Sequence, residues 1–173
     1  MDKAEYHLRL EELTKCVENR DYAGALTIVD SIEWRRVKSI RTLNMVADVY
    51  EANKRYRECK NILLLAYDRA SIGKSILYRL VEICLKLGEL EEAVDFYTEF
   101  AEVAPHDNSR FILKYKIYKA RRSPVQDQIA ILEEYKERLK QKTKELLDDA
   151  QIEESRIASE VILFADKICT DEE

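Results

Sequence analysis

The chain of 173 residues has little glycine, little proline and no long apolar run. Its 3 glycines and 2 prolines supply few turn residues for a β-sheet domain, so the composition favours helices. The opening residues lack an apolar signal core, and the longest apolar run is too short to span a membrane. The 4 cysteines and 2 histidines form no Cys-x-x-Cys pair and no zinc-binding spacing. We therefore expect a helical protein in a reducing, cytoplasmic compartment.

The overall composition predicts one globular domain spanning residues 1–173. Hydrophobic residues make up 46 % of the chain and charged residues 36 %, which is too apolar for general disorder. The formal net charge of −5 argues against a general affinity for nucleic acid.

A short pattern recurs every 34 residues. A tyrosine or leucine is followed three residues later by a small residue, and the small residues stand at positions 25, 59 and 93. That period is typical of arrays of helix pairs, in which one unit cannot bury its apolar face without a neighbour. Such arrays bind partners and rarely carry out chemistry. The three copies are Tyr22–Ala25, Tyr56–Cys59 and Leu90–Ala93.

The period divides the chain into four units, at about 6–39, 40–73, 74–107 and 108–138. Each unit is expected to form two helices, A and B, with a tight turn between them. Apolar residues fall at helical spacing in helix A of the second and third units, whereas the first unit is poorer, as expected of a terminal unit. The expected core residues are Leu43, Val46, Ala47 and Tyr50, then Leu77, Leu80, Val81 and Cys84, and in the fourth unit Phe111, Tyr115 and Tyr118.

These residues resemble the tetratricopeptide repeat family. The segment from Leu77 to Pro105 fits the family pattern best, through Leu80, Gly88, Ala93, Tyr97 and Pro105. The resemblance implies an all-α, right-handed solenoid of about four helix pairs, which binds a protein or peptide segment. Two stretches, 30–39 and 112–118, also resemble uncharacterised tetratricopeptide repeat proteins of Gram-positive anaerobic bacteria.

The C-terminal segment differs from the repeats. Ser123 and Pro124 suit the start of a helix, and no glycine or further proline follows. We expect one long helix, or two helices broken near Asp148 and Asp149. Residues 139–173 are expected to cap the last repeat. The alternative is self-association, or pairing with a partner, through Leu139–Ile168.

In the tetratricopeptide repeat family the A helices line the concave face, and the resemblance therefore implies a set of partner-binding residues. Tyr78 and Arg41 are the expected anchors, because tyrosine and arginine dominate interface hot spots. The alternative for each residue is an ordinary solvated helix face. The full set is Arg41, Asn44, Asp48, Tyr78, Glu82, Lys86, Lys116 and Lys119.

A basic stretch, Arg110–Arg122, offers a different class of function. Residues 108–122 carry 6 basic and no acidic side chains, with aromatic residues between them. The stretch could bind nucleic acid or an acidic peptide. Alternatively, its aromatic residues form the core stripe of helix A, which we favour because they fall at the core positions of the repeat.

No catalytic, cofactor-binding or metal-binding residue is expected. Gly73–Ser75 resembles the end of a phosphate-binding loop, but Asp68 occupies the position where the first glycine of that motif belongs. Cys16, Cys59 and Cys84 fall at core positions and should be inert. The sequence therefore predicts a non-enzymatic adaptor or scaffold.

Overall fold

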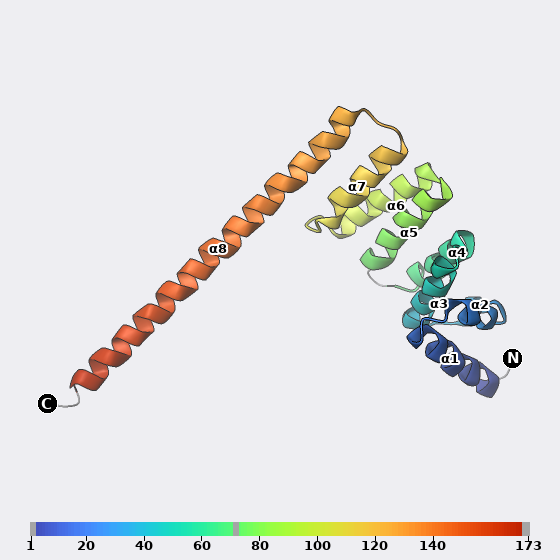
Figure 1. Cartoon of the computed structure of the whole chain (residues 1–173), viewed down its shortest axis with the longest axis horizontal. Coiled ribbons are helices and arrows are strands. Elements are labelled where there is room, and N and C mark those ends of the chain that lie inside the picture. Colours follow the sequence, from blue (N-terminus) through green and yellow to red (C-terminus); the bar gives the residue numbers. More distant parts are fainter. Residues whose placement is uncertain (1–2, 71–72, 171–173) are drawn as a thin grey trace. The chain divides into compact units, whose positions relative to one another are not determined.

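The structure is a computed structural model that describes residues 3–70 and 73–170, with side chains described as far as Glu153. Within these ranges all regular elements are helices, which confirms the predicted all-α fold class (Figure 1). The chain forms two compact units, Met1–Gln128 and Ile129–Glu173. The helices are α1 (Lys3–Glu18), α2 (Tyr22–Asp30), the short 3-10 helix η1 (Trp34–Arg36), α3 (Ile40–Ala52), α4 (Tyr56–Tyr67), α5 (Lys74–Leu87), α6 (Leu90–Val103), α7 (Ser109–Ala120) and α8 (Val125–Thr170).

The first unit is built from helix pairs in sequence order. Helix α1 packs against α2, α3 against α4, and α5 against α6. Each pair also packs on the next, through contacts of α2 with α3, α4 with α5, and α6 with α7 (Figure 1). Helix α5 contacts α7 as well, so the first helices of adjacent units meet directly. This arrangement is the helical-repeat solenoid that the 34-residue period predicts.

The small residues of the recurring pattern are buried where the paired helices meet. Ala25, Cys59 and Ala93 are each 0 % exposed. A small side chain at this position lets two helix backbones approach closely, which a larger one would prevent. The predicted helix A residues of the second and third units, from Leu43 to Tyr50 and from Leu77 to Cys84, are buried as expected.

Helix α5 has apolar residues buried on two sides. Ile76, Leu80 and Ile83 belong to a core cluster shared with α1–α4. Its other buried residues face a second cluster, formed with α6 and α7, and these are Leu77, Val81 and Cys84. A helix with buried residues on two sides must be covered on both, so α5 requires both neighbouring helix pairs.

All four turns between helices A and B have the same backbone conformation. A residue with positive φ stands at Arg20, Lys54, Gly88 and Arg122, each 34 residues from the next. In every copy the amide of the following residue donates to the carbonyl five residues earlier, as in the bond from Arg55 to the Tyr50 oxygen at 2.8 Å. These bonds form the Schellman motif, which satisfies the last carbonyls of a helix. The fourth copy ends α7 in the same way as the A helices of the other units.

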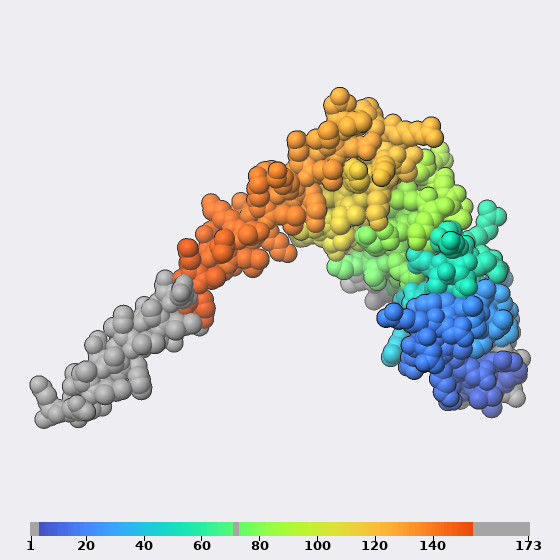
Figure 2. All heavy atoms as spheres, viewed as in Figure 1, coloured from blue at the N-terminus to red at the C-terminus, as the bar shows by residue number. Residues whose placement is uncertain are grey.

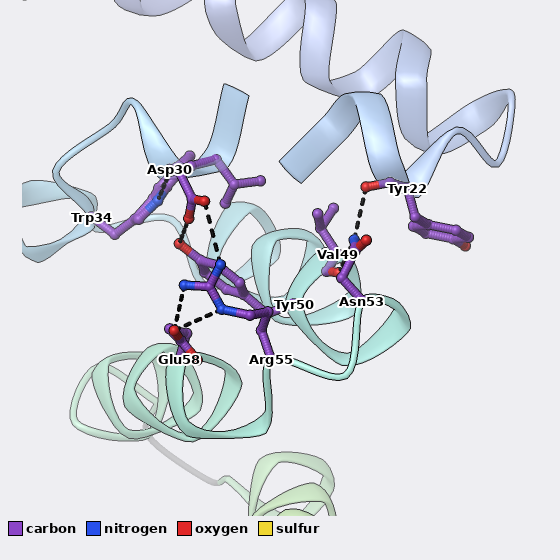
Figure 3. A network of polar contacts seen from close by, with 9 residues as sticks. Tyr22, Asp30, Trp34, Val49, Tyr50, Asn53, Arg55 and Glu58 are labelled. Carbon is purple, nitrogen blue, oxygen red and sulfur yellow. Dashed lines mark hydrogen bonds and ion pairs between the residues drawn. The ribbon is translucent and has the colours of Figure 1, made fainter. Parts of the chain in front are cut away.

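A polar network ties the first helix pair to the second (Figure 3). The Tyr50 hydroxyl donates to Asp30 at 3.0 Å, and Arg55 lies 3.6 Å from the same carboxylate. Burial, with the hydrogen bond to Asp30, raises the pKa of Tyr50 to about 12. The Asn53 amide joins α2 to α3, because it donates at 2.8 Å to the Tyr22 carbonyl as well as to a carbonyl of its own helix. These bonds fix the register of adjacent repeats.

One prediction about the fourth unit needs correction. Leu113 and Ile117 join Phe111 in the core, whereas Tyr115 and Tyr118 are only half-buried. The inward face of α7 is therefore rotated from the expected stripe, because α7 packs on both α5 and α6. Just before α7, the Asp107 carboxylate accepts a hydrogen bond at 2.9 Å from the Ser109 amide. That bond, together with one from Lys74, lowers the pKa of Asp107 to about 2.

Helix α8 begins at the end of the first unit and forms the second unit from Ile129 onward. It is a single helix of 46 residues without a break near Asp148 (Figure 1), and its atoms are coloured in Figure 2 as far as its side chains are described. The predicted role of residues 139–173 as a cap stays a prediction. From residue 154 onward, the expected self-association segment Leu139–Ile168 lies outside the residues whose side chains are described. Across residues 3–70 and 73–170, no helix combines the length and apolar content needed to cross a membrane.

The turn geometry makes a direct prediction. Lys54 adopts the left-handed conformation that glycine tolerates and that costs an ordinary residue about 1–2 kcal/mol. Lys54→Gly should therefore raise the free energy of unfolding by about 0.5–1 kcal/mol, after the entropic cost of glycine is subtracted. Chemical denaturation measures the change. Arg57→Gly, in the first turn of α4, is the control and should lower the same quantity by up to about 1 kcal/mol, because glycine is a poor helix former.

Candidate functional site

The eight predicted binding residues all lie on the first helices of three repeats. We call this surface the helix-A face. It comprises Arg41, Asn44 and Asp48 on α3, Tyr78, Glu82 and Lys86 on α5, and Lys116 and Lys119 on α7. Arg41, Asp48, Lys86 and Lys119 are exposed, and the other four are half-buried.

Ion pairs link α3 to α5 across this face. The Arg79 guanidinium lies 2.7 Å from Asp48 and 3.0 Å from Glu51, one turn apart on α3. Lys86 donates to the other oxygen of Glu51 at 2.6 Å and lies 5.2 Å from the centre of the Tyr56 ring. Residues in equivalent positions of successive units are 34 apart, so the 35-residue separation of Glu51 and Lys86 brings them together.

A second set of contacts links α5 to α7. Lys116 donates to Glu82, from which it is separated by one repeat period. The Tyr78 hydroxyl lies 3.4 Å from the same carboxylate. The Tyr78 ring packs edge-on against Phe100 of α6, with the ring centres 6.1 Å apart. Tyr78 is therefore held by the core on one side and reaches the helix-A face with its hydroxyl.

The ion pairs determine the charge state of the face. Burial alone would raise the pKa of Glu51, but hydrogen bonds from Lys86 and Arg79 hold it below its ordinary value. The hydrogen bonds that Lys86 donates to Glu51, and Lys116 to Glu82, raise the pKa of each lysine. Burial raises the pKa of Asp48 despite its contact with Arg79, and Glu51 nearby acts in the same direction. At neutral pH the face carries alternating fixed charges of both signs.

The set of binding residues predicted from the sequence did not include Arg79, Tyr56 or Glu51. Arg79 and Glu51 join α3 to α5, and the available signal was the near-34 spacing between Glu51 and Lys86. Arg41, Asn44 and Lys119 belong to the helix-A face but lie outside these ion pairs. The ion pairs therefore occupy the centre of the helix-A face. Arg41 lies on α3 and Lys119 on α7, which are the two outer helices of the face.

The surroundings of the buried cysteines and of one cysteine–carboxylate cluster determine their chemistry. Burial raises the pKa of Cys59 to about 12 and that of Cys84 to about 11, which leaves both thiols protonated. Cys84, Glu89 and Glu92 approach one another closely enough to hold a metal ion. Lys60 already lies between the two carboxylates, at 2.6 Å from each, so its ammonium group supplies the balancing charge.

The basic stretch Arg110–Arg122 contributes to the core as well as to the surface. Phe111, Leu113 and Ile117 are buried, and Lys116 pairs with Glu82. The Arg110 guanidinium stacks on Phe111, 4.5 Å from the ring centre. Part of the pattern of aromatic and basic residues therefore reflects packing of α7.

Comparison with known proteins agrees with the best-matched repeat. Residues 75–107 match the family model of the tetratricopeptide repeat, which supports a relationship to that family. The match covers α5, α6 and the connection to α7, and it falls on the unit predicted at 74–107. Repeats of this family generally mediate interactions with other proteins. No curated protein matches the chain.

The link between α3 and α5 can be measured by a double-mutant cycle on Glu51→Gln and Lys86→Gln. We expect a coupling energy of about 0.2–1 kcal/mol, because both side chains are partly exposed and water screens the pair. The coupling should shrink as salt is added. The control is a second cycle on Glu51→Gln and Lys119→Gln, because Lys119 is exposed and makes no contact with Glu51 in these ion pairs. This control cycle should give no coupling energy. Zero coupling in the first cycle would show that the pair does not join the repeats.

Proposed function

We propose that this chain is a non-enzymatic adaptor that binds a protein or peptide segment on the helix-A face. The observation that carries the proposal is that ion pairs join α3 to α5 and α5 to α7, which brings polar side chains and Tyr78 from three successive repeats onto one face. The tetratricopeptide repeat match at residues 75–107 supports an interaction role. Free Cys16, Cys59 and Cys84 agree with a reducing, cytoplasmic location.

The charges of the face indicate the kind of segment it binds. Glu51 and Glu82 already accept hydrogen bonds from lysines, so a partner gains little by approaching them. Arg41 and Lys119 are exposed cations on the two outer helices of the face. A segment with acidic groups at two separated points would satisfy both cations and lay an apolar side chain against Tyr78. The face was predicted to be concave, and that curvature remains part of this proposal.

A variant with Arg41→Glu and Lys119→Glu tests the proposal. Both residues are exposed and outside the ion pairs, so the fold should persist while the partner is lost. Arg36→Glu with Arg57→Glu is the control, because it changes the net charge equally at exposed positions outside the face. Tagged parent, variant and control chains are used to capture proteins from host lysate, and the eluates are compared by mass spectrometry.

We expect one or more proteins to be retained by the parent and the control but lost by the variant. Circular dichroism should give the same helix content for all three chains. If the three eluates contain the same proteins, partner binding does not use the helix-A face. A loss that the control shares would indicate a general charge effect.

Self-assembly is a second candidate function, favoured by the exposed leucines of α8. Leu132, Leu139 and Leu146 are 46 %, 41 % and 61 % exposed and recur every seven residues. Burying such a stripe against another helix is the usual source of stability for a long helix. Light scattering on the full chain tests this candidate. A dimer mass would support it, and a monomer mass at high concentration would remove it.

Nucleic-acid binding through Arg110–Arg122 is less well supported. Three apolar side chains of the stretch are buried in the core, and Lys116 forms an ion pair with Glu82. Base stacking requires exposed aromatic rings between cations, and Phe111 is buried. Protein binding is therefore the function that we propose.

A further inference from the structure

Helix α8 carries an exposed apolar stripe along one side. Every residue from 139 to 153 is exposed, and the leucines at 132, 139 and 146 fall at a seven-residue spacing. A shallow, open surface on the same side of the helix combines Leu132, Tyr135, Leu139 and Leu147 with the intervening Lys136, Lys140, Thr143 and Lys144. A seven-residue apolar repeat is the spacing at which two helices pack along a common seam.

The charges beside this stripe are divided into two adjacent blocks. Residues 136–144 contain 5 basic side chains and 1 acidic one, a net charge of +4. Residues 145–153 contain 4 acidic side chains and no basic ones, a net charge of −4. The two blocks have equal length and opposite sign, and they meet at Lys144 and Glu145, in the middle of the described stripe.

We propose that α8 pairs with α8 of a second copy in an antiparallel coiled coil centred about Glu145. This inference rests on the self-assembly candidate and is independent of the helix-A face. In an antiparallel pair, the basic block of each copy faces the acidic block of the other. In a parallel pair, each block would face its like, and charges beside the seam set the orientation of such helices.

Helix geometry gives this arrangement a definite register. At about 100° per residue, Lys142 and Asp149 lie on the same flank of the leucine stripe. In an antiparallel pair this flank of one helix faces the same flank of the other. Centring the pair near Glu145 brings Lys142 opposite Asp149 of the second copy, and the two-fold symmetry makes this contact twice. The same register places Thr143 beside Leu146 of the second copy, at the middle of the seam.

The size of the helix agrees with a paired role. At 1.5 Å per residue, 46 residues extend roughly 70 Å. The helix supplies the described part of the second compact unit, from Ile129 to Thr170. Most of the stability of helices in proteins comes from burial of an apolar face rather than from helix propensity. A second α8 supplies that burial and neutralises both charge blocks in one step.

The first test is the mass of the full chain with the stripe altered. We expect the parent to be a dimer by light scattering and Leu139→Ser/Leu146→Ser to be a monomer. Ile152→Ser is the matched control, because Ile152 is 68 % exposed but lies on the opposite side of α8 from the stripe. The control should remain a dimer. A dimer that survives both leucine substitutions would place the contact elsewhere and overturn the proposal.

The orientation is tested by the distance between two spin labels. A single cysteine is introduced by Glu134→Cys, with Cys16→Ser and Cys169→Ser, while Cys59 and Cys84 stay buried and unreactive. In the antiparallel pair the two labels lie on opposite sides of the centre near Glu145, about 33 Å apart along the helix axis. In a parallel pair they lie at the same height, less than about 25 Å apart.

The outcomes separate the orientation from the self-assembly candidate. A dimer with the long distance supports the antiparallel pair. A dimer with the short distance overturns the antiparallel arrangement and leaves self-assembly standing. A monomer at all concentrations removes both and leaves the helix-A face proposal untouched.

Discussion

The requirement that α5 be covered on two sides is the constraint on which the rest of the first unit depends. Ile83 packs with α1–α4, and Cys84, the next residue, packs with α6 and α7. Tyr67 and Phe96 contact both clusters and close the seam between them. Because neither half can cover α5 alone, the helix pairs are held as one body. The alignment of α3, α5 and α7 that defines the helix-A face follows from this packing.

The repeat period also organises the polar contacts. A side chain and its counterpart one unit later occupy equivalent places on successive helices, so opposite charges about 34 residues apart meet at the surface. Lys116 with Glu82 and Lys86 with Glu51 are joined in this way on the helix-A face. On the second helices, Tyr67 is hydrogen-bonded to Glu99, which raises the pKa of Tyr67 to about 12. Core packing and surface pairing therefore repeat with the same period.

Much of the fold was predictable, because burial at Leu43–Tyr50 and Leu77–Cys84 follows from helical spacing alone. Gly88 indicates one of the turns, but Arg20, Lys54 and Arg122 adopt the same left-handed conformation although they are not glycines. The prediction of which face of α7 points inward was wrong, because packing against α5 and α6, rather than the local spacing of apolar residues, decides the rotation of this helix. The ion pairs of Arg79 were not predictable, since the set of residues that meet depends on how successive repeats are stacked.

Native-state hydrogen exchange on Ile83→Val tests the central role of α5 most directly. Removing one buried methylene group from the cluster shared with α1–α4 should cost about 0.5–1.5 kcal/mol. If α5 couples the two halves, the opening free energies of the most protected amides in α3 and in α6 should fall by the same amount. A fall in α3 with no change in α6 would show that the halves open independently and would contradict this account.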